Sequence, residues 1–224
     1  MRLDDRRERQ SARPSQRHRP ARSTGVRGSI AVGAVGGLAW SASLRGWMIQ
    51  IAGDESSFAW LGTFGLILLP GAVLGALLGW AANLQLNGNL SPARQRWLMA
   101  SPLVLAAALL DPRIFQLLIT NGQGGGALGV VVIGMTGAYA LSGRGSRTSA
   151  TISGLVALLL IVACGSIAAD STPLTTPHGA WIAIQAVSLL GVLCVACSIP
   201  YRTTKVSADR RVSLFGEGSI ADTR

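Results

Sequence analysis

Long apolar stretches alternate with short polar segments along most of this 224-residue chain. A helix needs about 20 apolar residues to cross a hydrocarbon core of about 30 Å, and most of the apolar stretches have about this length. The pattern therefore predicts an all-α fold, an integral membrane bundle of about six transmembrane helices. The expected spans are residues 29–51, 59–82, 97–110, 126–142, 151–169 and 181–199.

The second stretch is the clearest span. From Ala59 to Ala82 it holds 24 residues without a charge. Trp60 and Trp80 mark its two ends, as aromatic residues do at membrane interfaces. Pro70 lies near its middle, where it is expected to kink the helix.

The third stretch is too short to cross a bilayer alone, because it holds only fourteen residues between Trp97 and Leu110. The helix could begin earlier, at Pro92, since Ser91-Pro92 has the form of an N-cap followed by proline at the first helical position. A second short helix capped by Asp111 could instead continue the span. We favour a break at Asp111-Pro112, because Asp caps helices and Pro starts them.

Polar tails flank the apolar region. Residues 1–28 are rich in Arg, Ser, Gln and Pro, and such a segment buries too little apolar surface to offset its ordering entropy. We expect a disordered basic tail at 1–28, a six-span domain at 29–200 and a second disordered basic tail at 201–224. Small residues at 41–43 resemble a signal-peptide cleavage site, but three glycines dilute the apolar run before them, so we expect the first span to be retained.

The charge distribution orients the predicted bundle. Only 13% of the residues are charged, against about 25% in soluble domains, and the net charge of +10 comes mainly from the two ends. With the N-terminus inside, eighteen of the twenty basic residues lie in cytoplasmic segments, and only Arg45 and Arg113 lie outside. This is the positive-inside pattern, so we expect both termini in the cytoplasm, a location in the cell membrane and no nucleic-acid partner.

The residue inventory argues against an enzyme. Lys205 is the only lysine, which excludes a P-loop, and His18 and His178 are the only histidines, which excludes a zinc site with several histidine ligands. Ser153-Gly154 has the Ser-Gly pair of intramembrane serine proteases, but no predicted span holds a histidine to act as its base. We expect no catalytic residue, no metal site and no cofactor.

The three cysteines all fall in apolar runs. Cys194 and Cys197 have C-x-x-C spacing, but they lack both the βαβ context of a redox motif and a second pair to complete a zinc site. We expect them, like Cys164, to be small buried hydrophobic residues.

Charged and polar residues gather at the predicted outer face. The first outer loop carries a cation and two carboxylates among aromatic residues, and the end of the third span carries a second cluster. They could form a ligand or ion mouth or a partner surface, or they could anchor the interface with a weak surface ion pair. We hypothesise that Arg45 pairs with Asp54 or Glu55. The candidate polar residues are Arg45, Asp54, Glu55, Asp111, Arg113 and Gln185.

The stretch from Arg45 to Thr63 resembles outer-loop segments of uncharacterised multi-pass inner-membrane proteins from bacteria with Ala/Gly/Arg-rich proteomes. The resemblance covers about residues 40–82. It implies a bacterial multi-pass membrane protein, and it implies no particular activity.

Two features bear on function. Gly71, Gly75 and Gly79 recur every four residues and form a small-residue stripe that allows a second helix to approach closely. Gln185, the one amide well inside a span, could bond another helix or line a path. Because a transporter needs several polar residues at mid-depth, we favour a structural or accessory membrane protein whose partners are the lipid bilayer and other membrane proteins or a second copy. The alternative is a small-solute or ion transporter with a mouth near Arg45, Asp54, Glu55 and Asp111.

Overall fold

A computed structural model of the chain describes residues 25–53, 58–110, 112, 116 and 125–202. These residues form helices with short connections, and no strand occurs among them. In chain order the elements are α1 (Val26–Ala52), η3 (Trp60–Leu68), α2 (Leu69–Leu86), α3 (Pro92–Met99), η4 (Ser101–Leu110), α5 (Gly125–Leu141), α6 (Arg147–Ser171), α7 (Pro177–Cys197) and η5 (Ile199–Tyr201).

Three helices in the described part of the chain are long and apolar enough to cross a membrane: Trp60–Leu86, Arg147–Ser166 and Pro177–Tyr201. The helix Gly126–Leu141 is apolar but shorter. α1 has the necessary length, but its glycines, serines and two arginines lower its mean hydropathy. The predicted all-helical class is therefore confirmed. Of the six expected spans, three correspond to helices that are long and apolar enough to cross a membrane on their own.

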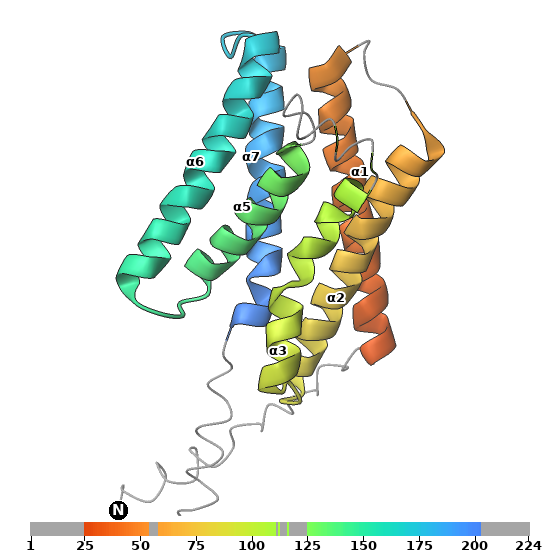
Figure 1. Cartoon of the computed structure of the whole chain (residues 1–224), viewed down its shortest axis with the longest axis vertical. Coiled ribbons are helices and arrows are strands. Elements are labelled where there is room, and N and C mark those ends of the chain that lie inside the picture. The colour runs from red at the N-terminus through yellow and green to blue at the C-terminus, as the bar shows by residue number, and fades with distance from the viewer. Residues whose placement is uncertain (1–24, 54–57, 111, 113–115, 117–124, 203–224) are drawn as a thin grey trace, which may run out of the picture.

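The helices form two groups that meet along α7 and η4 (Figure 1). α1 packs along α2 in one group, and α5, α6 and α7 pack together in the other. η4 contacts both α2 and α5, and α1 also contacts α7. The N-terminal end of α1 and the C-terminal end of α7 lie at the same end of the bundle (Figure 1).

Side-chain caps fix where three of the helices begin. The hydroxyl of Ser91 accepts the backbone N–H of Arg94 at 3.4 Å, which confirms the predicted cap with Pro92 as the first helical residue. Ser146 and Thr176 cap α6 and α7 in the same way, each over 3.1 Å. Because of these caps both helices begin four residues earlier than the apolar pattern indicated.

Pro70 lies where the second span changes its winding. The segment η3 is wound as a π-helix through Leu68, and α2 continues as an α-helix from Leu69. Proline lacks an N–H and its ring clashes with the carbonyl four residues earlier in an α-helix. A wider turn before Pro70 relieves this clash and keeps Trp60–Leu86 continuous.

The helix in the region of the third expected span begins at Pro92, and Asp111 of the favoured break lies outside the described residues. The structure adds a break that we did not predict, at Ala100, just before Pro102. From Ser101 the chain winds as a 3₁₀-helix for ten residues. A 3₁₀-helix rises about 2.0 Å per residue against 1.5 Å in an α-helix, so the same apolar residues reach further.

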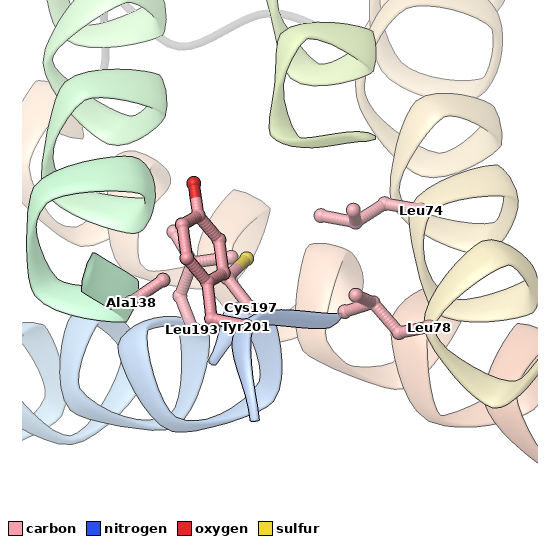
Figure 2. Close-up of a cluster of buried hydrophobic side chains, with 6 residues drawn as sticks. All are labelled: Leu74, Leu78, Ala138, Leu193, Cys197 and Tyr201. Atoms are coloured by element: carbon pink, nitrogen blue, oxygen red, sulfur yellow. The ribbon is translucent and has the colours of Figure 1, made fainter. Parts of the chain in front are cut away.

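The core of the bundle lies between α2, α5 and α7. Leu74 and Leu78 of α2 face Leu193 and Cys197 of α7, with Tyr201 and Ala138 completing the cluster (Figure 2). All six side chains are buried. This cluster joins the two groups of helices toward one end of the bundle.

Most of both predicted tails lies outside the described residues. Most of the tail residues that are described are helical and not disordered as predicted. Residues 26–28 form the first turn of α1, and Tyr201 is the last residue of η5. Tyr201 is only 8% exposed, so the packed region extends slightly beyond the expected limit at residue 200.

Candidate functional site

Of the six candidate polar residues, the structure describes Arg45 and Gln185. Asp54, Glu55, Asp111 and Arg113 lie outside the described residues. The Cζ of Arg45 lies 5.0 Å from the centre of the Phe58 ring, a cation–π contact between the C-terminal half of α1 and the segment just before η3. The pairing of Arg45 with Asp54 or Glu55 stays a prediction.

Gln185 contacts α1. Its Oε1 accepts a hydrogen bond of 3.0 Å from the Nε2 of Gln50, 135 residues earlier in the chain. The same Nε2 lies 3.4 Å from the carbonyl oxygen of Gly46. Of the two roles considered for Gln185, the geometry matches a bond between helices.

Two tryptophans extend this seam between α1 and α7. The indole Nε1 of Trp40 donates to the carbonyl oxygen of Leu189 at 2.9 Å, and that of Trp47 donates to the carbonyl oxygen of Ile182 at 3.1 Å. Moving seven residues forward on α1 moves seven residues back on α7, so the helices run antiparallel. Such bonds satisfy polar groups that would otherwise face an apolar surrounding.

The glycine stripe of α2 packs directly against the backbone of α1. A Cβ added to Gly75 would overlap the carbonyl oxygen of Gly33 and lie 2.8 Å from the Cα of Gly37. A Cβ on Gly71 would overlap the side chain of Ser41, and one on Gly79 would overlap the carbonyl oxygen of Ser29. The approach is so close that no side chain larger than hydrogen fits at these positions.

The α1 side of this interface was missed by the sequence reasoning. Gly33, Gly37 and Ser41 also recur every four residues, which is the same signal as on α2. The hydroxyl of Ser41, 1% exposed, donates to the carbonyl oxygen of Leu38 at 3.0 Å. At the far end of the interface the Nδ2 of Asn83 donates to the hydroxyl of Ser29 at 3.3 Å.

Two glutamines tie the helices together at the end of the bundle where α7 terminates. The Nε2 of Gln85 donates to the carbonyl oxygens of Ile199 and Arg202. The Nε2 of Gln95 donates to the carbonyl oxygen of Pro200 at 2.8 Å. These amides satisfy carbonyl groups at a helix terminus, which have no partner within the helix.

Basic side chains are concentrated at this same end. Among the described residues, Arg45 is the one arginine that lies toward the opposite end. The others occur in the first turn of α1, in α3, around the start of α6 and after η5: Arg27, Arg94, Arg96, Arg144, Arg147 and Arg202.

Two hollows lie beside α2, and both are lined almost wholly by apolar atoms. The smaller, about 260 Å³, lies where the glycine interface meets α7, with Trp40 and Leu193 in its wall. The larger, about 590 Å³, lies between α2 and the α3–η4 segment, toward the basic end. Arg94 and Ser101 are the polar side chains in its lining.

The cysteines are packing residues in the structure. Cys194 and Cys197 are free and buried, and Cys164 is free and half-buried. The Sγ of Cys194 donates to the carbonyl oxygen of Ile133 at 3.4 Å and fills the space that a Cβ on Gly137 would need. The thiol thus belongs to the contact between α5 and α7.

Comparisons with models of known protein families, with curated proteins and with solved structures gave no match. What the protein does must therefore be inferred from its own residues and their geometry.

Proposed function

We propose that this protein is a six-span integral protein of the cell membrane, with both termini in the cytoplasm, and that it serves as a structural or accessory component through helix packing. The observation that carries the proposal is how the polar groups of α1 are used. Trp40, Trp47 and Gln50 all bond to α7. These groups hold helices together and do not line a polar hollow.

The six-span topology rests on packing as well as on hydropathy. Three segments are too short or too polar to cross a membrane alone: α1, α5 and the α3–η4 segment. Each of them packs against one of the three helices that are long and apolar enough. Helix contacts of this kind allow a less hydrophobic or irregular segment to lie at membrane depth, because its polar groups are shielded from lipid. The long rise of η4 supports a crossing by the third segment.

The orientation rests on the clustering of arginine. The end that carries Arg27, Arg94, Arg96, Arg144, Arg147 and Arg202 is the end expected to face the cytoplasm under the positive-inside rule. The connection 172–176 and the start of α7 lie at the other end (Figure 1). Both described ends of the chain lie at the arginine-rich end.

A transporter would be expected to show several polar side chains around a mid-depth site. Gln185, the one mid-span amide that we expected, is bonded to Gln50. The hollow beside the glycine interface has apolar and glycine residues in its lining. These features favour the structural role.

The proposal can be tested in two steps with the purified full chain and in cells. In proteoliposomes, we expect ion and small-solute flux no greater than in empty vesicles. Flux that Arg45→Ala or Gln185→Ala abolishes would contradict the structural role and establish the transporter.

The second step addresses packing with partners. α6 exposes a stripe of large apolar residues that includes Leu155, Leu159 and Val162, each at least 60% exposed. A photo-crosslinking residue at position 159 should link the protein in cell membranes to one membrane protein of defined mass or to a second copy. Crosslinks to lipid alone would contradict an accessory role through this helix.

A further inference from the structure

The larger hollow, between α2 and the α3–η4 segment, has the chemistry of a lipid site. Its volume of about 590 Å³ lies in the range of pockets that hold small-molecule ligands. Its walls come from Leu77, Trp80, Trp97, Leu98, Leu103 and Val104. We call it the α2–α3 groove.

The groove has a charged mouth. Arg94 is the charged residue in its lining, and it lies near the start of α3, at the arginine-rich end of the bundle. Trp97, one turn further along α3, is 82% exposed although it is a large aromatic residue. Exposed tryptophan beside arginine is typical of the level of lipid headgroups, where the indole ring and the guanidinium group each find a suitable surrounding.

A second polar group lies deeper in the groove. Ser101 is 4% exposed and belongs to the lining. Its Oγ is buried and has no hydrogen-bond partner among the described residues. A buried hydroxyl without a partner is costly, and a ligand with an acceptor at this depth would remove the cost. Ser101 lies about 10 Å further from the basic end than Arg94, counted along the helix.

From the mouth inward, the groove presents an arginine, a hydroxyl and an apolar wall. An anionic phospholipid has matching groups in the same order: a phosphate, ester carbonyls and acyl chains. We propose that the α2–α3 groove binds one anionic phospholipid of the cytoplasmic leaflet. Its phosphate bonds to Arg94, an ester carbonyl accepts a hydrogen bond from Ser101, and an acyl chain lies along Leu77, Leu98 and Leu103. The positive charge at this end selects an anionic headgroup over a neutral one.

The inference rests on the proposed membrane location, and it is tested separately from the orientation. The purified full chain in mild detergent is mixed with equal amounts of phosphatidylglycerol and phosphatidylcholine of the same acyl chains, and retained lipid is measured by native mass spectrometry. We expect one phosphatidylglycerol retained in preference to phosphatidylcholine. The detergent measurement does not depend on which face is cytoplasmic, so a reversed topology would leave its result intact.

Two variants and a matched control locate the site. Arg94→Gln should lower the preference for phosphatidylglycerol about five-fold, the effect associated with one basic residue at an anionic lipid surface. Arg147→Gln removes an arginine at the same end but outside the groove lining, so it should leave the preference unchanged. Leu103→Trp, at a position 54% exposed, should fill the groove and reduce retention of both lipids without lowering the thermal unfolding temperature.

Three results would overturn the proposal. The first is equal retention of the two lipids by the unaltered chain, which indicates unselective binding. The second is equal loss of preference in Arg94→Gln and Arg147→Gln, which indicates a diffuse charge effect. The third is that the unaltered chain forms a dimer that retains no lipid, and that Leu103→Trp dissociates this dimer. That result would show that a second copy occupies the groove.

Discussion

The Nε2 of Gln50 on α1 and the Oε1 of Gln185 on α7 lie 3.0 Å apart and share a hydrogen bond. Both side chains are half-buried at the contact between the two groups of helices. In the proposed membrane location an amide that faces lipid would lack partners, so the bond would satisfy a donor of Gln50 and an acceptor of Gln185. The bond closes the bundle by joining the first helix to the last.

We expect Gln50→Ala and Gln185→Ala to be coupled. In a double-mutant cycle on the free energy of unfolding in detergent, the coupling should be about 0.6 kcal/mol, the average for hydrogen bonds between membrane helices. Ser188→Ala is the control, because among the described residues the hydroxyl of Ser188 bonds within its own helix, at Ile184. Additive effects of the two glutamine substitutions would contradict the pairing.

Two adjacent glycines of α1 should respond differently to the same substitution. A Cβ on Gly37 would overlap the carbonyl oxygen of Gly71, whereas a Cβ on Gly36 would have no atom within 4 Å. Gly37→Ala should therefore lower the free energy of unfolding by roughly 1–3 kcal/mol, the usual cost of overpacking. Gly36→Ala should cause no loss, since alanine also favours the helix. Equal effects in thermal unfolding of the two variants would show that α1 and α2 do not meet through this face.

The indole of Trp40 should contribute through its N–H as well as its ring. Trp40→Phe keeps an aromatic ring but removes the hydrogen bond to Leu189, so we expect a loss of about 1 kcal/mol in the free energy of unfolding. Trp181→Phe, on a residue that is 58% exposed, serves as the comparison and should change little. An unchanged stability in Trp40→Phe would mean that the bond adds nothing to the seam.

Local features were the ones that the sequence predicted well. The span around Ala59–Ala82 followed from an uninterrupted apolar run, and the start of α3 from Ser91-Pro92. Both depend on neighbouring residues alone. The apolar pattern predicted the starts of α6 and α7 four residues too far along the chain, because each helix begins with a polar first turn before its apolar run.

Features that depend on distant residues were not predicted. The stripe at Gly71, Gly75 and Gly79 was visible in the sequence, but its partner on α1 is defined only by packing. The bond between Gln50 and Gln185 joins residues 135 apart, and nothing in either local sequence specifies the other. The 3₁₀ winding of η4 also escaped prediction, because Pro102 could equally have ended the helix.

The glutamine ties at the basic end should protect the last turn of the bundle. Replacing Gln85 and Gln95 together by leucine removes the donors to Ile199, Pro200 and Arg202. We expect faster exchange of the amide hydrogens of Ile199, Tyr201 and Arg202, because local opening of this turn then breaks fewer hydrogen bonds. In the described part of the chain the amide of Asn87 bonds to Asn83 in its own turn, so Asn87→Ala should leave that exchange unchanged. Unaltered exchange in the double variant would contradict the tie.

The central claim is that the arginine-rich end of a six-span bundle faces the cytoplasm. Labelling of single introduced cysteines in intact cells with a membrane-impermeant thiol reagent tests it most directly. The cysteines are introduced at exposed positions, Asn89 and Thr148 at the predicted cytoplasmic end and Thr175 at the opposite end. Gly145, also at the predicted cytoplasmic end, is avoided because its φ of 80° would strain a cysteine. We predict labelling above the level of the unaltered chain for Thr175→Cys, and for Asn89→Cys and Thr148→Cys only after the membrane is opened. Labelling of Asn89→Cys or Thr148→Cys in intact cells would contradict the topology.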